Sequence, residues 1–232
     1  GNLALTEIFM ILPISLAILT ALKRKFDSTS LFIAGMLFAI ASLYKQVGAQ
    51  EAAALGVYLF LYNKNFIDFV KQGLVLTLGF TVPFVITILY FAPKGLLNEY
   101  IFAAYTYYQI YLGESPQYAL LINVLKVMPV ASAIGYGLYK KYKVKRVTFL
   151  NLLFLWVAFS FLGSYFSGRT YGHYLVQSVP ALSLLIASIP ISTFKFDRAK
   201  IIFLASFVLP ILFLTHLLFS EFLSGGPINQ LK

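Results

Sequence analysis

The sequence predicts an all-α fold, a polytopic transmembrane bundle of about eight helical segments that includes a pair of short half-helices. Hydrophobic residues make up 60% of the 232 residues, and the mean hydropathy of +0.84 exceeds what one soluble core buries. Apolar runs of about 17 to 23 residues, each long enough to cross roughly 30 Å of hydrocarbon, recur along the chain. Segments of about ten residues with alternating polarity, which indicate barrel strands, do not occur.

The first third of the chain predicts one span and a hairpin. Residues 3–22 form the first apolar run and lead into a basic loop at 23–27. The runs at 31–44 and 52–62 are each too short to cross comfortably, and a polar turn with glycine, 45–51, separates them. We therefore expect two half-helices that meet at this turn, an arrangement tolerated where the backbone lines a protein cavity.

The rest of the chain predicts five further spans within the same domain. A long loop at 93–118 is rich in tyrosine, which is typical of a helix lying in the membrane interface. No linker or soluble domain interrupts the pattern, so residues 1–232 are predicted to form a single transmembrane domain. The five spans are expected at 73–92, 119–139, 147–166, 175–193 and 201–220.

The charge distribution predicts the orientation. The net charge is +10, but most Lys and Arg fall in the loops at alternate gaps between spans, which is typical of cytoplasmic loops. A membrane protein is therefore indicated, and nucleic acid is not an expected partner. The chain has no cysteine and no glycine-rich phosphate loop or hydrolase motif. The loops assigned to the cytoplasm are 23–27, 63–72, 140–146 and 195–200.

The remaining ionisable residues gather at the opposite, outer ends of the predicted helices. Charged groups at the edge of the hydrocarbon usually face a cavity and meet a partner. Arg169 is the strongest candidate for an anionic ligand, because its planar fork matches phosphate and Gly168 and Gly172 allow close approach of the backbone. The alternative is that Arg169 extends to lipid headgroups. The other members of this outer group are Glu7, Lys45, Glu51 and His173.

The residues that follow Arg169 extend the candidate binding site. Tyr171, His173, Tyr174 and Gln177 offer hydrogen-bond donors and a stacking face for a sugar. An aromatic belt at the membrane surface is the alternative for the tyrosines. A histidine at a helix mouth is more often a hydrogen-bonding group than a base, so His173 is interpreted as a supporting contact.

Three further charged residues leave alternatives open. Lys45 ends a short helix, where a cation either caps the helix or contacts a ligand. Glu7 follows Thr6 at the start of an apolar helix, so it either caps exposed amides or acts as an acid facing the outer cavity. Lys126 lies about two helical turns below the outer surface, where it either extends to that surface or pairs with Glu7 or Glu51.

Three stretches together resemble a known family. "LALTEIFMILPISLAILTALKRK", "LFIAGMLFAIASLYKQVGAQEAAALGVYLFL" and "SGRTYGHYLVQSVPALSLL" occur in the order found in polytopic GT-C glycosyltransferases of the protein-mannosyltransferase, aminoarabinose-transferase and RgtA/B/C/D-like type. The first resembles the family's small-Thr-acid helix start, and the third its Arg-x-x-x-His-Tyr-Leu-x-Gln-x-x-Pro segment.

This resemblance implies a plasma (cytoplasmic) membrane enzyme with its active site on the extracytoplasmic face. It would move a sugar from a polyprenyl-phosphate carrier to a lipid, glycan or protein acceptor. Glu7 matches the family's second, auxiliary acid, Arg169 and Lys45 are candidates for the phosphate, and His173 with Tyr174 shapes the donor site. The family's principal base precedes the Thr-Glu helix, so the chain is expected to be N-terminally truncated. No cofactor is assigned, and a divalent metal stays an open alternative, because most potential metal ligands would lie upstream.

Two other functions fit parts of the pattern. A transporter or flippase of a lipid-linked or anionic substrate would use the same outer cations and hairpin, but it should also show an inner polar site and inverted repeats, and neither is detected. An O-antigen ligase or polymerase should carry a large outer loop with its own Arg and His, and residues 93–118 contain neither.

Overall fold

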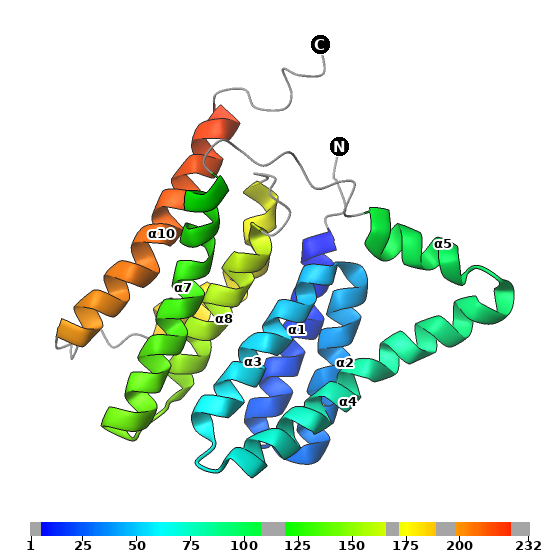
Figure 1. The fold of residues 1–232 in the computed structure, drawn as a ribbon, viewed down its shortest axis with the longest axis horizontal. Coiled ribbons are helices and arrows are strands. Elements are labelled where there is room, and N and C mark those ends of the chain that lie inside the picture. Colours follow the sequence, from blue (N-terminus) through cyan, green and yellow to red (C-terminus); the bar gives the residue numbers. More distant parts are fainter. Residues whose placement is uncertain (1–5, 108–118, 166–171, 189–197, 224–232) are drawn as a thin grey trace.

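The computed structural model describes residues 6–107, 119–165, 172–188 and 198–223, and within these ranges the chain is helical and contains no strand (Figure 1). The all-α prediction is confirmed. Four helical stretches are long and apolar enough to cross a membrane, which confirms the predicted class of helix. These stretches are Thr6–Lys23, Phe66–Lys94, Leu121–Val144 and Arg198–His216.

Each of the eight predicted segments contains a helix. Four of the six predicted full spans are among the stretches long enough to cross, whereas 147–166 and 175–193 contain shorter helices within the described residues, Phe149–Ser164 and Tyr174–Ser188. Shorter helical pieces join the eight helices. The eight are α1 (Thr6–Lys23), α2 (Ser28–Tyr44), α3 (Ala49–Tyr62), α4 (Phe66–Phe91), α7 (Ala119–Tyr139), α8 (Phe149–Ser164), α9 (Val179–Ser188) and α10 (Arg198–Leu223). The joining pieces are α5 (Leu97–Ile101), the 3-10 turns η1 (Gln46–Gly48), η2 (Ala92–Lys94) and η5 (Gly172–Ser178), and the π-helical turns η3 (Phe102–Thr106) and η4 (Lys140–Val144).

Helix α8 forms the centre of the bundle. Its side chains are buried almost all round, with Trp156, Leu152 and Leu155 fully or nearly fully enclosed. It packs against α3, α7, α9 and η5. A helix that is hydrophobic on every side is typical of the core of a large bundle. Thr148 begins the helix with a capping box that includes Asn151.

Helices α2 and α4 cross at two glycines. A Cβ atom added at Gly35 would lie 2.2 Å from the carbonyl oxygen of Leu76, and one added at Gly79 would lie 2.0 Å from the carbonyl oxygen of Phe32. The absence of side chains at these two positions lets the helix backbones touch, as small residues do at interfaces between membrane helices. The pair α2 and α4 makes one of the most extensive contacts in the fold.

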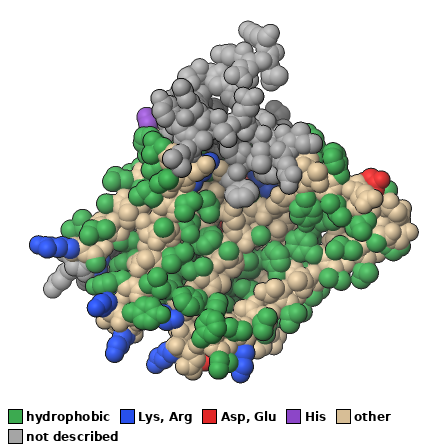
Figure 2. All heavy atoms as spheres, in the orientation of Figure 1, with side chains coloured by type: hydrophobic (Ala, Val, Ile, Leu, Met, Phe, Trp, Pro, Cys, Tyr) green, Lys and Arg blue, Asp and Glu red, His purple; other side chains and the backbone are tan. Residues whose placement is uncertain are grey.

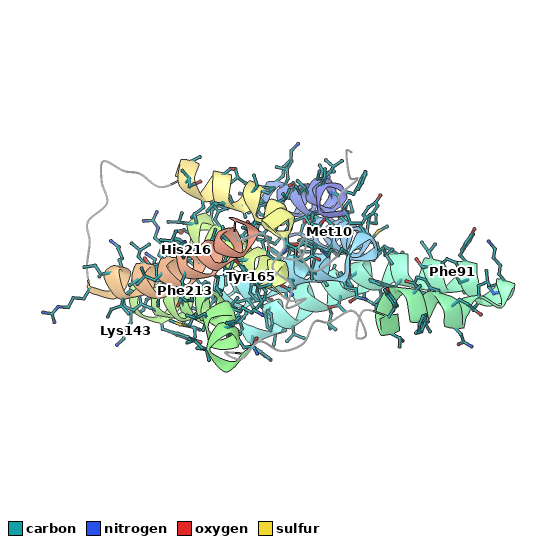
Figure 3. The ribbon with its side chains drawn as sticks, turned by 90° about the horizontal axis from the view of Figure 1, so that it is seen from above. Met10, Phe91, Lys143, Tyr165, Phe213 and His216 are labelled. Atoms are coloured by element: carbon teal, nitrogen blue, oxygen red, sulfur yellow. The ribbon has the colours of Figure 1, made fainter. Side chains whose placement is uncertain are left out.

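The far end of α4 leaves the bundle. Seen from above in Figure 3, Phe91 lies well away from Met10 and Tyr165, which are near the middle of the molecule. Helix α5 follows after a turn at Gly95, whose φ is +70°. Apolar side chains such as Ile86 and Leu89 are exposed along this arm, as is ordinary for a helix surrounded by lipid. Helical structure was predicted within 93–118 and is found at 97–107.

The basic turns gather at one end of the bundle. In Figure 1 the turns between α1 and α2, α3 and α4, and α7 and α8 lie at the lower end with the start of α10, while the start of α1 and the turn at η1 lie at the upper end. Figure 2 shows Lys and Arg side chains along this lower and left-hand edge. The alternating up-and-down path is therefore the one that the charge pattern predicts.

Several predicted boundaries need correction. Helices α2 and α3 each begin three residues earlier than predicted. Asp27 accepts a hydrogen bond from the amide of Ser30 at 2.7 Å, which extends α2 at its start. By helical rise, α2 and α3 are about 25 and 21 Å long, whereas the predicted runs correspond to about 21 and 17 Å. Helix α4 begins at Phe66, within the stretch predicted as a loop. The predicted span 175–193 divides into η5 and α9, with Pro180 in the first turn of α9, and its last residues lie outside the described ranges.

Candidate functional site

Glu7 and Lys45 form an ion pair at the upper end of the bundle. The Nζ atom of Lys45 donates to Oε1 of Glu7, and the two side chains are 14% and 3% exposed. The hydroxyl of Thr6 donates to Oε2 of Glu7 at 3.3 Å. The charge of Lys45 is therefore paired with Glu7, and neither residue serves only as a helix cap.

Tyr174 completes this group from a distant part of the chain. The Nζ atom of Lys45 lies 3.6 Å from the centre of the Tyr174 ring, which places the cation over the aromatic face. The backbone of Tyr174 is fixed because its carbonyl oxygen accepts a hydrogen bond from the hydroxyl of Ser164 at 2.8 Å. The sequence-predicted residues Glu7, Lys45 and Tyr174 are thus brought together from α1, the end of α2 and η5.

A second polar cluster lies inside the bundle, where α3 and η5 meet α8. Glu51 is fully buried, and its Oε1 accepts a hydrogen bond from the hydroxyl of Ser160 at 2.9 Å. The carbonyl oxygen of Ser160 in turn accepts from the Nε2 atom of Gln177. Ser160 therefore connects α3 to η5 through its side chain and its backbone.

Gln177 faces the protein interior. It is 3% exposed, and a Cβ atom at Gly163 would lie 2.5 Å from its Nε2 atom and 3.0 Å from Oε1 of Gln50. The glycine leaves room for both amide groups against α8. Gln177 thus holds η5 against α8.

Gln46 ties the outer loop to the same end of the bundle. Its Nε2 atom donates to the carbonyl oxygen of Ala104 in the tyrosine-bearing segment after α5. Tyr105 and Tyr107 on this segment are exposed. The turn that carries Lys45 therefore also anchors an aromatic segment beside it.

Other predicted residues are placed less fully or not at all. Arg169 and Tyr171 lie outside the described residues. His173 lies in η5, but only its backbone is described. Lys126 on α7 is partly buried, and no ion pair joins it to Glu7 or Glu51 among the described residues. Glu7 pairs with Lys45 instead, a partner that the sequence analysis did not consider.

An apolar groove of about 650 Å³ runs between α3, α4 and α7. On α3 its wall is made of small residues, Ala49, Ala52, Ala53 and Gly56, and Gly73 on α4 faces them. The groove begins at Ala49, two residues before Glu51, and continues toward the basic end at Phe60 and Phe69.

Ser160, Gln50 and Gly163 were missed by the sequence analysis. Ser160 and Gly163 lie in the apolar run "VAFSFLGS", where a lone hydroxyl and a glycine give no signal until α3 and η5 are packed against them. Among the described residues, no three His, Cys, Asp or Glu side chains come together as metal ligands.

Comparisons with protein-family models, with curated proteins and with solved structures found no match for this chain.

Proposed function

We propose that the protein is a membrane glycosyltransferase that moves a sugar from a polyprenyl-phosphate carrier to an acceptor at the non-basic, extracytoplasmic end of the bundle. The observation that carries this proposal is the group of Glu7, Lys45 and Tyr174. It combines an acid, a cation and an aromatic ring at the end of an apolar bundle opposite the basic turns.

The chemistry of the group suits a lipid phosphate leaving from a sugar. In such a transfer the acceptor hydroxyl attacks the anomeric carbon, a base takes its proton, and the phosphate departs with the bonding electrons. Among the described residues, Lys45 is the cation that would bind that phosphate. Arg169 is a second candidate, which the sequence alone suggests. The phosphate would compete with Glu7 for Lys45, which would release the Glu7 carboxylate to bind or orient the acceptor.

The apolar groove gives the proposal further support. A polyprenyl tail is long and apolar, and the small side chains of α3 together with Gly73 leave an open apolar surface that starts near the polar clusters. The donor's sugar and phosphate would then lie at the upper end of the groove and its tail along α3 and α4.

The test is turnover by the purified full-length protein in lipid vesicles with polyprenyl-phosphate sugars as donors. We expect formation of free polyprenyl phosphate together with a glycosylated acceptor. We expect Arg169→Ala to abolish that turnover without changing the thermal unfolding temperature, and Lys143→Ala, exposed at the basic end, to leave it unchanged. Undiminished turnover by Arg169→Ala contradicts the phosphate assignment, and movement of an intact lipid-linked substrate without transfer would indicate a transporter instead.

A further inference from the structure

We propose that Glu51 is a proton-binding site, a carboxyl group kept in the protonated, neutral form between α3 and α8. The proposal concerns the state of a buried group and does not depend on the proposed enzyme activity. One oxygen of the Glu51 carboxyl group is buried without a hydrogen-bond partner among the described residues. Glu51 is 0% exposed, and that oxygen is its Oε2 atom, whereas Oε1 accepts a hydrogen bond from Ser160.

Among the described residues, no ion pair compensates a charge on Glu51. On η5, His173 is described in its backbone only. Neither α2 nor α8 contains a Lys, Arg, His, Asp or Glu within its bounds, and η1 contains none either. Glu51 lies in the first turn of α3, whereas Asp68 and Lys71 lie at the start of α4, which follows the last residue of α3. Lys126 of α7 makes no ion pair with Glu51, and the cation beside η5, Lys45, pairs with Glu7. An isolated ionised carboxylate in such surroundings is so costly that the group takes up a proton instead.

The residue before Glu51 carries a further buried atom without a partner among the described residues, Oε1 of Gln50. The other two such atoms, Nε1 of Trp156 and the hydroxyl of Tyr165, belong to α8 and to the residue that follows it. When Glu51 is ionised, its Oε2 atom and the Oε1 atom of Gln50 are both hydrogen-bond acceptors, so they cannot form a hydrogen bond with each other. A proton on Oε2 of Glu51 converts that atom into a donor, and the nearest unmatched acceptor in the sequence is Oε1 of Gln50.

A bound metal cation is the less suitable occupant. Cations such as Ca²⁺ take about six to eight oxygen ligands. In the described part of this cluster, Oε1 of Gln50 and Oε2 of Glu51 are the oxygens without partners, and the carbonyl oxygen of Ser160 already accepts from Gln177. A proton requires one donor position and one acceptor, which is what the cluster offers.

The neutral carboxyl would fix the position of the candidate site. Glu51 holds the hydroxyl of Ser160, whose carbonyl oxygen holds Gln177, and Gln177 belongs to the same short turn as Tyr174. A charge on Glu51 would disturb this interface, whereas a proton leaves it intact.

The direct test is infrared spectroscopy of the full-length protein at neutral pH, as the difference between wild type and Glu51→Gln. We expect the difference spectrum to show the loss of a protonated carboxyl C=O band that shifts in D₂O. The matched control is Glu7→Gln, which should remove ionised carboxylate bands because Glu7 is paired with Lys45. Loss of carboxylate bands in Glu51→Gln, or a C=O band that disappears when sodium or calcium is added, overturns the proposal.

Thermal unfolding supplies a second readout. Glutamine is neutral and nearly the same shape as a protonated glutamate, so Glu51→Gln should unfold within a few degrees of wild type at neutral pH, whereas Glu51→Ala should unfold at a clearly lower temperature because Ser160 loses its acceptor and a cavity remains. A loss of stability in Glu51→Gln as large as that in Glu51→Ala would show that the glutamate charge is required.

Discussion

Among single residues, Glu7 and Lys45 are central to the candidate site, because they form a largely buried ion pair. Each residue taken alone has an ordinary explanation as a helix cap, and the sequence does not distinguish that role from a functional one. The structure shows that the two side chains meet across the ends of α1 and α2, under the ring of Tyr174. Because both side chains are largely buried, loss of either one removes a charge partner that water does not replace.

Removing one partner of the pair should therefore destabilise the protein. We expect Lys45→Met to lower the free energy of unfolding by about 3 kcal/mol, because it removes the buried cation that pairs with the Glu7 carboxylate. Denaturant unfolding of the purified protein in detergent measures this change.

A double variant separates the pair from the packing of its side chains. Lys45→Met combined with Glu7→Gln should recover most of the loss, because no charge is then left unpaired. If the effects of the two single substitutions simply add, the two residues do not stabilise one another and the site as described is wrong.

At the scale of helices, the sequence predicted which segments are helical better than how they pack. Apolar periodicity located all eight segments, since each must bury its backbone in its own hydrogen bonds. It did not show that α3 and η5 both pack against α8, because the residues that make this contact, Ser160 and Gly163, resemble ordinary positions of an apolar helix. The division of residues 175–188 into a 3-10 turn and a helix also depends on contacts with α8 that a local pattern does not contain.

The crossing of α2 and α4 gives a prediction at this scale. Gly79→Ala should lower the free energy of unfolding by about 1 to 3 kcal/mol, because its Cβ atom would meet the backbone of Phe32. Gly73→Ala on the same helix is the matched control, since nothing lies within 4 Å of the added atom. It should be neutral or stabilising by up to about 1 kcal/mol. Equal thermal stabilities for the two variants would contradict the close crossing.

At the scale of the whole molecule, the bundle has two unlike ends. The basic turns lie at one end, and the pair of Glu7 and Lys45 lies with η1 at the other. The alternation of Lys and Arg along the sequence predicted this separation, since charge clusters at every second gap must gather at one end of an up-and-down bundle. The apolar outer surfaces of α4 and α10 are consistent with helices that face lipid.

The orientation of the two ends can be tested directly, because the chain has no cysteine of its own. A single cysteine at Glu99→Cys, exposed in α5, should react with a membrane-impermeant maleimide added to intact cells. Lys143→Cys, exposed in the basic turn η4, should react only after the cells are permeabilised. The reverse pattern would place the candidate site on the cytoplasmic side and contradict the proposed function.

We propose that the end of the bundle with Glu7, Lys45 and Tyr174 acts on a polyprenyl-phosphate sugar. The most direct test of this proposal is the rate at which Lys45→Ala releases polyprenyl phosphate in lipid vesicles, compared with Lys143→Ala at the opposite end and with the folded fraction of each variant measured beside it. We expect a loss of at least about a hundredfold per folded molecule for Lys45→Ala, as for removal of one group that stabilises a departing charge, and no loss for Lys143→Ala. Equal rates for the two variants would contradict the account.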